Sequence, residues 1–356
     1  MKLFQSLKLG SMQLSNHIVM APLTRSRAPQ NLPNEHMAKY YSDRATAGLI
    51  ITEGTSPSIN GLGYPRIPGC FDQAQVDGWK KVTSAVHKQG GRIFLQIMHC
   101  GRVGHPLNLP KGGKLMAPSA LAAPGQMYTD QEGPKDHPVP QEMNESDIQA
   151  AIKEYATCAK HAVDAGFDGV EIHAANGYLI DQFLNTASNH RRDNWGGSID
   201  NRIRFCLEVS KAIIANIGAD KVGIRISPYG AFNGMQPDPQ MDELYAKLAN
   251  ELSKLKLTYV HVVDHSSMGA PPVSANLKAQ IRDLFKGLYI LSGGYDSAAK
   301  AEADIQAKKG DLVAFGRMFI SNPNLVAKLK SGAALVQPDH NTFYTPGDKG
   351  YNDYPA

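Results

Sequence analysis

Eight short apolar segments alternate with helix-like segments along the chain, and this alternation constrains the fold more than any other feature of the sequence. The apolar segments lie at 17–23, 49–54, 92–99, 169–175, 222–228, 259–264, 288–294 and 311–317. Within each segment, odd and even positions are both largely apolar, which is typical of strands buried on both faces. Because strands that alternate with helices are joined by crossovers, the sequence predicts a parallel sheet.

The helix-like segments carry start and stop signals. Apolar residues recur at helical spacing from Ser146 onward, where Ser146 and Gln149 form an S-x-x-Q capping box, and Gly166 is placed to end that helix. Further helices are expected at 75–89, 198–217, 240–256, 275–286, 295–309 and 322–331.

We therefore predict an α/β fold, a (β/α)8 TIM barrel, with residues 1–356 as one domain, since eight strands are the number that closes such a barrel. An open doubly wound sheet would show the same alternation, but no G-x-G-x-x-G follows the first strand. Residues 100–143, after the third strand, are rich in Pro and Gly and hold no convincing helix. A connection of that length is expected to be a functional cap or lid.

Composition narrows the class of protein. Hydrophobic residues make up 42% and charged residues 20%, which excludes collagen, coiled coil and wholesale disorder. The net charge of +4 is too small to indicate nucleic acid or an anionic membrane as a partner. Four cysteines without a CxxC pair indicate neither a metal cluster nor a disulfide scaffold. No apolar run reaches the roughly 18 residues of a membrane span, so we expect a cytoplasmic protein.

In such barrels the chemistry lies at the C-terminal strand ends, and several of these ends are polar or glycine-rich. Gly293–Gly294 and Gly316–Arg317 follow the last two strands, where barrels commonly bind a phosphate. The alternative is a pair of tight turns with an exposed arginine. Arg225 lies inside a buried strand and needs an anionic or polar acceptor, either a ligand or a core carboxylate such as Glu171.

His173 and Asn176 leave the fourth strand together and could donate two hydrogen bonds into the mouth of the barrel. Without a third ligand at suitable spacing they do not indicate a metal site. A satisfied structural loop is the alternative, and Tyr178, two residues further on, favours the functional interpretation.

Longer segments then resemble a known family. HAANGYLIDQFLN (173–185) and SNHRRDNWGGSIDNRIRF (188–205) are similar to segments of the Old Yellow Enzyme family of FMN-dependent ene-reductases. The similarity continues in APLTRSRA (21–28), ITEGTSPS (51–58), FLQIMHCGR (94–102), VGIRISP (222–228), AFGRMFISNP (314–323) and GDKGYNDYP (347–355). The N-ethylmaleimide-reductase and pentaerythritol-tetranitrate-reductase branch looks most similar. The resemblance implies the same FMN-binding (β/α)8 barrel.

The resemblance also implies cofactor contacts with non-covalent FMN, reduced by NADPH or NADH. Thr24 would hydrogen-bond flavin O4, and Gln96 and Arg225 would hold the pyrimidine side of the ring. The remaining cofactor residues would be Pro22, Leu23 and Gly54 along the ring and Gly293, Gly294, Gly316 and Arg317 at the phosphate.

For the substrate, the resemblance implies that His173 and Asn176 bind the carbonyl oxygen and that Tyr178 donates a proton. Tyr64 and Tyr344 match aromatic positions near the substrate, and Met98 stands where many relatives have Trp. The implied enzyme is an NAD(P)H-dependent ene-reductase that reduces the C=C bond of small α,β-unsaturated carbonyl and nitro compounds in a ping-pong hydride relay. It would be a monomer or a small homo-oligomer.

Two other functions fit parts of the pattern. A flavin-free, phosphate-binding barrel lyase or isomerase would need a lysine or a carboxylate base at a strand end, and Glu53 and Asp264 are the carboxylates that stand free in the sequence. A non-catalytic ligand-binding barrel would not require Thr24, Gln96 and Arg225 together.

Overall fold

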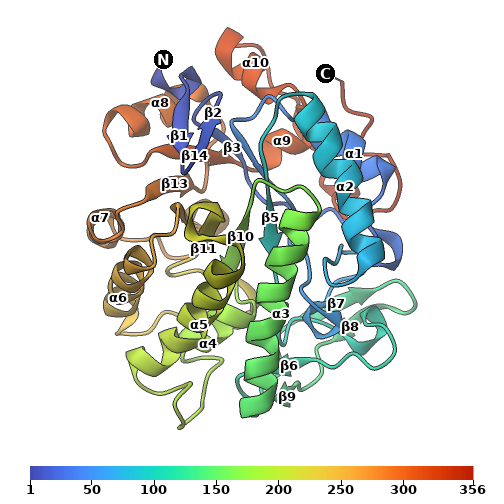
Figure 1. The fold of residues 1–356 in the computed structure, drawn as a ribbon, viewed down its shortest axis with the longest axis vertical. Coiled ribbons are helices and arrows are strands. Elements are labelled where there is room, and N and C mark those ends of the chain that lie inside the picture. Colours follow the sequence, from blue (N-terminus) through green and yellow to red (C-terminus); the bar gives the residue numbers. More distant parts are fainter. Residues whose placement is uncertain (356) are drawn as a thin grey trace.

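Eight parallel strands close into a barrel in this computed structural model, which describes residues 1–355 (Figure 1). In chain order they are β3 (Ile18–Met20), β4 (Leu49–Ile51), β5 (Ile93–Ile97), β10 (Gly169–Ala174), β11 (Val222–Ile226), β12 (Tyr259–Val263), β13 (Leu288–Ser292) and β14 (Leu312–Phe315). The last strand pairs in parallel with the first, β14 with β3, and this closure confirms the barrel over the open sheet.

Helices surround the barrel, as Figure 1 shows. They are α1 (Glu35–Ser42), α2 (Gln73–Lys88), α3 (Glu145–Asp164), α5 (Ile199–Ile217), α6 (Met241–Lys254), α7 (Ala275–Leu284), α8 (Ala298–Gln306) and α10 (Leu325–Ser331). Three helices were not predicted, namely α1 and the short helices α4 (Leu179–Leu184) and α9 (Arg317–Ser321). α4 and α9 span only six and five residues, too few to show a clear 3.6-residue periodicity.

The predicted capping box of α3 is wrong by two residues. The N-cap is Asn144, whose side chain accepts from the backbone N–H of Asp147, while the Asp147 carboxylate accepts from the N–H of Asn144. Ser146 instead donates to Asn144 Oδ1 at 2.7 Å. Both residue types are good N-caps, so the position where the chain leaves β9 (Gln141–Glu142) decides between them. The stop signal is confirmed, since Gly166 takes φ +90° directly after the C-cap.

The N-terminal end of the barrel is closed by an antiparallel hairpin, β1 (Leu7–Leu9) and β2 (Met12–Leu14). Leu9 and Leu14 are fully buried against side chains of the barrel interior, among them Phe94 and Tyr259. This apolar plug leaves the opposite, C-terminal end of the barrel as the open one.

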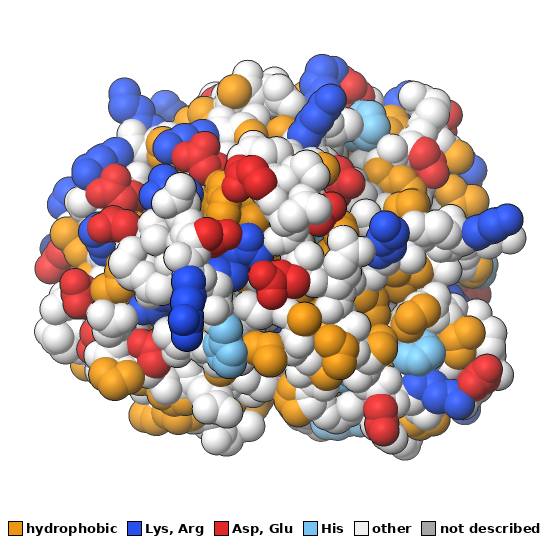
Figure 2. Space-filling view, turned by 90° about the horizontal axis from the view of Figure 1, so that it is seen from below, with side chains coloured by type: hydrophobic (Ala, Val, Ile, Leu, Met, Phe, Trp, Pro, Cys, Tyr) orange, Lys and Arg blue, Asp and Glu red, His pale blue; other side chains and the backbone are white. Residues whose placement is uncertain are grey.

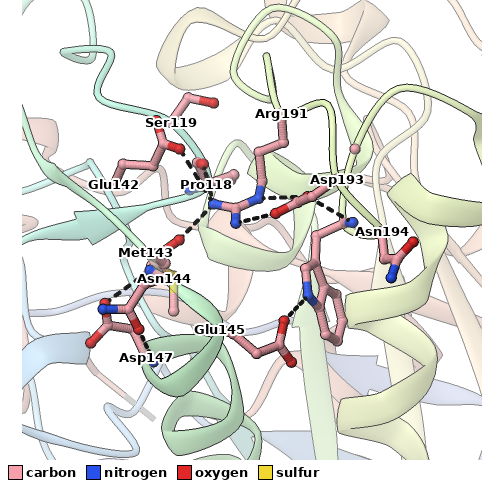
Figure 3. Close-up of polar contacts among 12 residues, drawn as sticks. Pro118, Ser119, Glu142, Met143, Asn144, Glu145, Asp147, Arg191, Asp193 and Asn194 are labelled. Atoms are coloured by element: carbon pink, nitrogen blue, oxygen red, sulfur yellow. Dashed lines mark hydrogen bonds and ion pairs between the residues drawn. The ribbon is translucent and has the colours of Figure 1, made fainter.

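The segment 100–143 contains short strands and no α-helix. β6 (Met116–Ala117) pairs with β9, and β7 (Gln126–Thr129) pairs with β8 (Gly133–Asp136). Arg191 holds the base of this segment, donating to the carbonyl oxygens of Pro118 and Met143 at 2.9 and 2.6 Å (Figure 3). That the segment acts as a lid stays a prediction.

The surface carries charges of both signs. On the face seen from below Figure 1, basic and acidic side chains are interspersed (Figure 2). Within residues 1–355, no helix is both long and apolar enough to cross a membrane.

Candidate active site

A cavity of about 790 Å³ opens at the C-terminal end of the barrel. This volume lies within the usual range for small-molecule and cofactor sites. Every residue that the sequence assigned to the cofactor or the alkene substrate lines it, although these residues come from all parts of the chain. They are Pro22, Leu23, Thr24, Gly54, Tyr64, Gln96, Met98, His173, Asn176, Tyr178, Arg225, Gly293, Gly294, Gly316, Arg317 and Tyr344.

The floor of the cavity carries an arginine without an ion-pair partner. The Arg225 side chain lines the cavity, and its Nε has no hydrogen-bond partner among the described residues. Burial lowers the pKa of Arg225, and the charge of Glu171 opposes that shift. The Glu171 carboxylate itself accepts from Gln96 Nε2 at 2.8 Å and from His261 Nδ1 at 2.9 Å. No Arg225–Glu171 ion pair forms within the described part of the chain, which favours a ligand as the acceptor for Arg225.

Glycine backbone borders one end of the cavity. Gly293 has φ +115°, and a Cβ there would stand 2.0 Å from the carbonyl oxygen of Asp264. Gly294 is also left-handed, with φ +67°. Arg317 is exposed beside them and makes no ion pair or side-chain hydrogen bond within residues 1–355. Backbone N–H groups and a free cation are what a phosphate requires.

Gly54, after β4, lies against the side chain of Met98, after β5. A Cβ on Gly54 would stand 2.4 Å from the sulfur of Met98, which is itself 1% exposed. A larger residue at this position would therefore displace the end of the Met98 side chain.

Two side chains, one near the end of β10 and one in the loop that follows it, offer unused polar atoms. His173 is 2% exposed, and both His173 Nδ1 and Asn176 Oδ1 are buried without hydrogen-bond partners in the described structure. Burial, followed by the charge of Arg225, holds the pKa of His173 well below its usual value, so its ring is neutral. A buried polar atom without a partner is rare and points to a missing ligand.

The backbone of this loop is held from behind. Asn176 takes φ +61°, and its N–H donates to Ser227 Oγ at 2.8 Å. The N–H of Gly177 donates to Asp181 Oδ2 at 2.8 Å, and burial raises the pKa of that carboxyl to about 7. The left-handed turn therefore fixes the direction in which His173 and Asn176 present their side chains.

Tyr178 stands beside His173, with ring centroids 4.9 Å apart. Its hydroxyl lies 3.0 Å from the hydroxyl of Tyr64. Burial raises the pKa of Tyr178 well above its usual value, so the phenol keeps its proton at neutral pH.

Several residues that support the site were not predicted from the sequence. Asp181 is an isolated acidic residue in α4, and nothing in its spacing indicates a buried carboxyl. Phe232 and His265 line the cavity and pack ring against ring, with centroids 4.7 Å apart. They come from two loops far apart in the sequence, so no local pattern could have joined them.

The two carboxylates that stood free in the sequence are both engaged, which corrects that expectation. Glu53 is fully buried, accepts from the Tyr41 hydroxyl at 3.2 Å, and does not line the cavity. Asp264 lines the cavity but pairs with Lys278. Neither is an available base, so the geometry disfavours a flavin-free lyase or isomerase.

Comparison with known proteins agrees with this geometry. The profile of the NADH:flavin oxidoreductase / NADH oxidase family matches residues 2–335. A probable flavin mononucleotide-dependent alkene reductase of Leishmania infantum is 42% identical over 358 residues, covering 99% of this chain and 97% of its own. Chanoclavine-I aldehyde reductase of Penicillium roqueforti is 43% identical over 370 residues, covering 99% and 96%.

Solved structures give the same answer. Morphinone reductase superposes with a TM-score of 0.95 at 43% identity, over 99% of this chain and 96% of its own. The Old Yellow Enzyme homologue of Zymomonas mobilis superposes with a TM-score of 0.94 at 39% identity, over 100% of both chains. The chain is a member of the Old Yellow Enzyme family. The predicted resemblance is thereby confirmed, and the cofactor is FMN with NAD(P)H as reductant.

The residues of this Old Yellow Enzyme fit FMN at both ends of the cavity. On the floor, the unpartnered guanidinium of Arg225 and the amide of Gln96 match a ring edge that carries carbonyl oxygens and an N–H. At the other end, Gly293, Gly294 and Arg317 match a single terminal phosphate.

Proposed function

We propose that the protein is an NAD(P)H-dependent ene-reductase that acts on small α,β-unsaturated carbonyl and nitro compounds by a ping-pong sequence. The proposal is supported by His173, whose buried Nδ1 has no partner, and by Asn176, whose side-chain amide makes no hydrogen bond among the described residues; both line the cavity with the neutral phenol of Tyr178. One cavity holds these groups together with the residues assigned to FMN. Reductant and alkene would therefore use the same space in turn.

When bound, FMN would accept a hydride equivalent from NAD(P)H and deliver it to the β-carbon of the alkene. The polar residues serve the other end of the alkene. His173 and Asn176 would donate hydrogen bonds to the carbonyl or nitro oxygen and stabilise the negative charge that develops there, as an oxyanion hole does. Because His173 is neutral, it donates one hydrogen bond and brings no net charge to the site.

Tyr178 would supply the proton to the α-carbon. Its hydroxyl keeps its proton at neutral pH, so the phenol is already in the protonated form that a general acid requires. Tyr64 lies 3.0 Å away and holds the Tyr178 hydroxyl in one position.

The names of the relatives support this chemistry. Among them are the probable alkene reductase of Leishmania infantum and a 12-oxophytodienoate reductase of Oryza sativa, which is 37% identical over 371 residues. We further propose that residues 1–356 act as one catalytic domain, with 100–143 as the cap of its mouth.

Isotope labelling tests the proposed reaction. With NAD(P)D as reductant and 2-cyclohexenone as substrate, deuterium should appear at the β-carbon of cyclohexanone. In D2O with unlabelled reductant, it should appear at the α-carbon. Recovery of unreduced enone, or reduction at the carbonyl to an alcohol, would contradict the proposal.

A further inference from the structure

We propose that Glu171 is a positioning residue that sets the polarity of the cavity floor. Its carboxylate orients the Gln96 amide so that the oxygen faces the ligand, and it supplies a fixed negative charge beneath Arg225. This inference concerns the cofactor site alone and does not depend on the alkene chemistry or on Tyr178.

The orientation of Gln96 follows from hydrogen-bonding capacity. Glu171 in β10 lies opposite Gln96 of β5 in the sheet register and is fully buried. A carboxylate only accepts hydrogen bonds, so the atom of Gln96 that approaches it at 2.8 Å must be the amide nitrogen. The amide oxygen is then the polar atom that Gln96 has left for a ligand, since it has no partner among the described residues and the side chain lines the cavity.

The second carboxylate oxygen is also engaged. His261 Nδ1 lies 2.9 Å from Glu171 Oε2, and burial lowers the pKa of His261, so a neutral ring donates its single N–H here. Because both oxygens accept hydrogen bonds, the orientation of the Glu171 carboxylate is fixed. The fixed carboxylate in turn fixes the orientation of the Gln96 amide.

The same carboxylate acts on Arg225 through space. No ion pair joins them among residues 1–355, yet Glu171 is the strongest charge that favours the protonated form of this buried guanidinium. Arg225 favours negative charge on the ring, whereas Glu171 opposes it, and burial weakens the screening of both. The floor thus presents one hydrogen-bond acceptor, the amide oxygen of Gln96, and one cation, Arg225, whose positive charge is partly offset by Glu171.

Two consequences can be measured on the bound cofactor without any alkene. A floor with a fixed acceptor prefers FMN, which has an N–H at ring position 3, over 3-methyl-FMN, which does not. A fixed negative charge disfavours the reduced flavin. Both the preference and the reduction potential are properties that a merely structural role would leave unchanged.

The test compares Glu171→Gln with Glu53→Gln. Both residues are fully buried carboxyls on barrel strands or their ends, but Glu53 does not line the cavity. Dissociation constants for FMN and 3-methyl-FMN are measured on the apoprotein, and midpoint potentials on the reconstituted protein. An amide at 171 can donate as well as accept, so Gln96 is free to turn.

In Glu171→Gln we expect the preference for FMN to fall at least fivefold. We also expect the ratio of reduced to oxidised flavin at fixed potential to rise about tenfold, or ~30 mV for a two-electron couple. Glu53→Gln should change neither. An unaltered preference and potential in Glu171→Gln, or equal changes in both variants, would overturn the proposal.

Glu171→Asp keeps the test decisive if Glu171→Gln does not fold. It retains the charge but withdraws the carboxylate from Gln96 by one methylene. The preference for FMN should fall while the potential stays near that of the native protein. An unchanged preference in a folded Glu171→Asp protein would contradict the assigned role of the carboxylate.

Discussion

At the scale of single residues, His173 is the side chain whose environment points most clearly to a ligand. It is buried, neutral and without a hydrogen-bond partner in the described structure. Replacing it by Ala should weaken enone binding and slow flavin reoxidation, because one oxyanion donor contributes about 2.7–4 kcal/mol. Binding titrations and reoxidation rates with several enones measure this, and unchanged values would make His173 a purely structural residue of β10.

Tyr178→Phe separates a proton donor from a packing residue. The variant keeps the ring beside His173 but loses the hydroxyl. Flavin reduction by NAD(P)H should stay near normal, since it needs no proton from this phenol. Reoxidation by cyclohexenone should slow by about 10²–10⁴-fold, as expected for loss of a general acid.

A nitroalkene provides the internal control for Tyr178→Phe. Its reduced product is stable as a nitronate and can leave unprotonated, so its reoxidation step should be affected less. Equal slowing with both acceptors would mean that Tyr178 only shapes the cavity.

At the level of secondary structure, strands and long helices could be predicted because the spacing of apolar residues in the sequence matches their periods. All eight barrel strands lie within the predicted apolar segments or differ from them by a residue or two. The start of α3 could not be fixed, because Asn144 and Ser146 are equally good caps and tertiary context chose between them. Gly293 and Gly294 could be placed at the cavity because glycines that directly follow a barrel strand lie at its C-terminal end.

Long-range polar contacts could not be predicted from the sequence. Arg27 donates to the backbone carbonyls of Thr342, Phe343, Gly347 and Lys349, and thereby ties the C-terminal tail to the loop after β3. An arginine in a loop is usually a surface residue, so no pattern in the sequence indicates that Arg27 is almost completely buried. The same holds for the contact between Asp181 and the Tyr245 hydroxyl of α6, which are 64 residues apart in the sequence.

The junction of β4 and α1 gives a prediction about pH. Burial raises the pKa of Glu53 to about 7, above its value of 4.5 in an unfolded chain. Between these values the folded protein holds a proton that the unfolded chain has released. The free energy of unfolding therefore falls as pH rises through this window, by up to ~3 kcal/mol from Glu53 alone.

Glu53→Gln should remove that contribution. Relative to the native protein, the variant should gain stability between pH 5 and pH 8. Asp181 titrates in the same range in both proteins, so the difference between them isolates Glu53. Urea unfolding at the two pH values measures it, and a constant difference would show that Glu53 is ionised throughout.

At the scale of the whole molecule, closure of the barrel brings strand ends from all parts of the chain around one cavity. We propose that the glycine-rich end holds the single terminal phosphate of FMN. Arg317→Ala should weaken FMN retention about ten- to a hundred-fold, since it removes a charge-assisted contact of roughly 1.5–3 kcal/mol. Equilibrium dialysis of the variant and chromatography of the released chromophore measure both points, and FAD or an undiminished affinity would contradict them.

If one cavity serves both half-reactions of an ene-reductase, anaerobic double-mixing stopped flow should resolve them in sequence. The protein is first mixed with one equivalent of NADPH or NADH, and the bleaching of the flavin is followed. It is then mixed with cyclohexenone. We expect complete bleaching, then full recovery of the oxidised spectrum at a rate that rises and saturates with enone concentration, with one saturated ketone formed per flavin. A flavin that bleaches but is not reoxidised by the enone would contradict it.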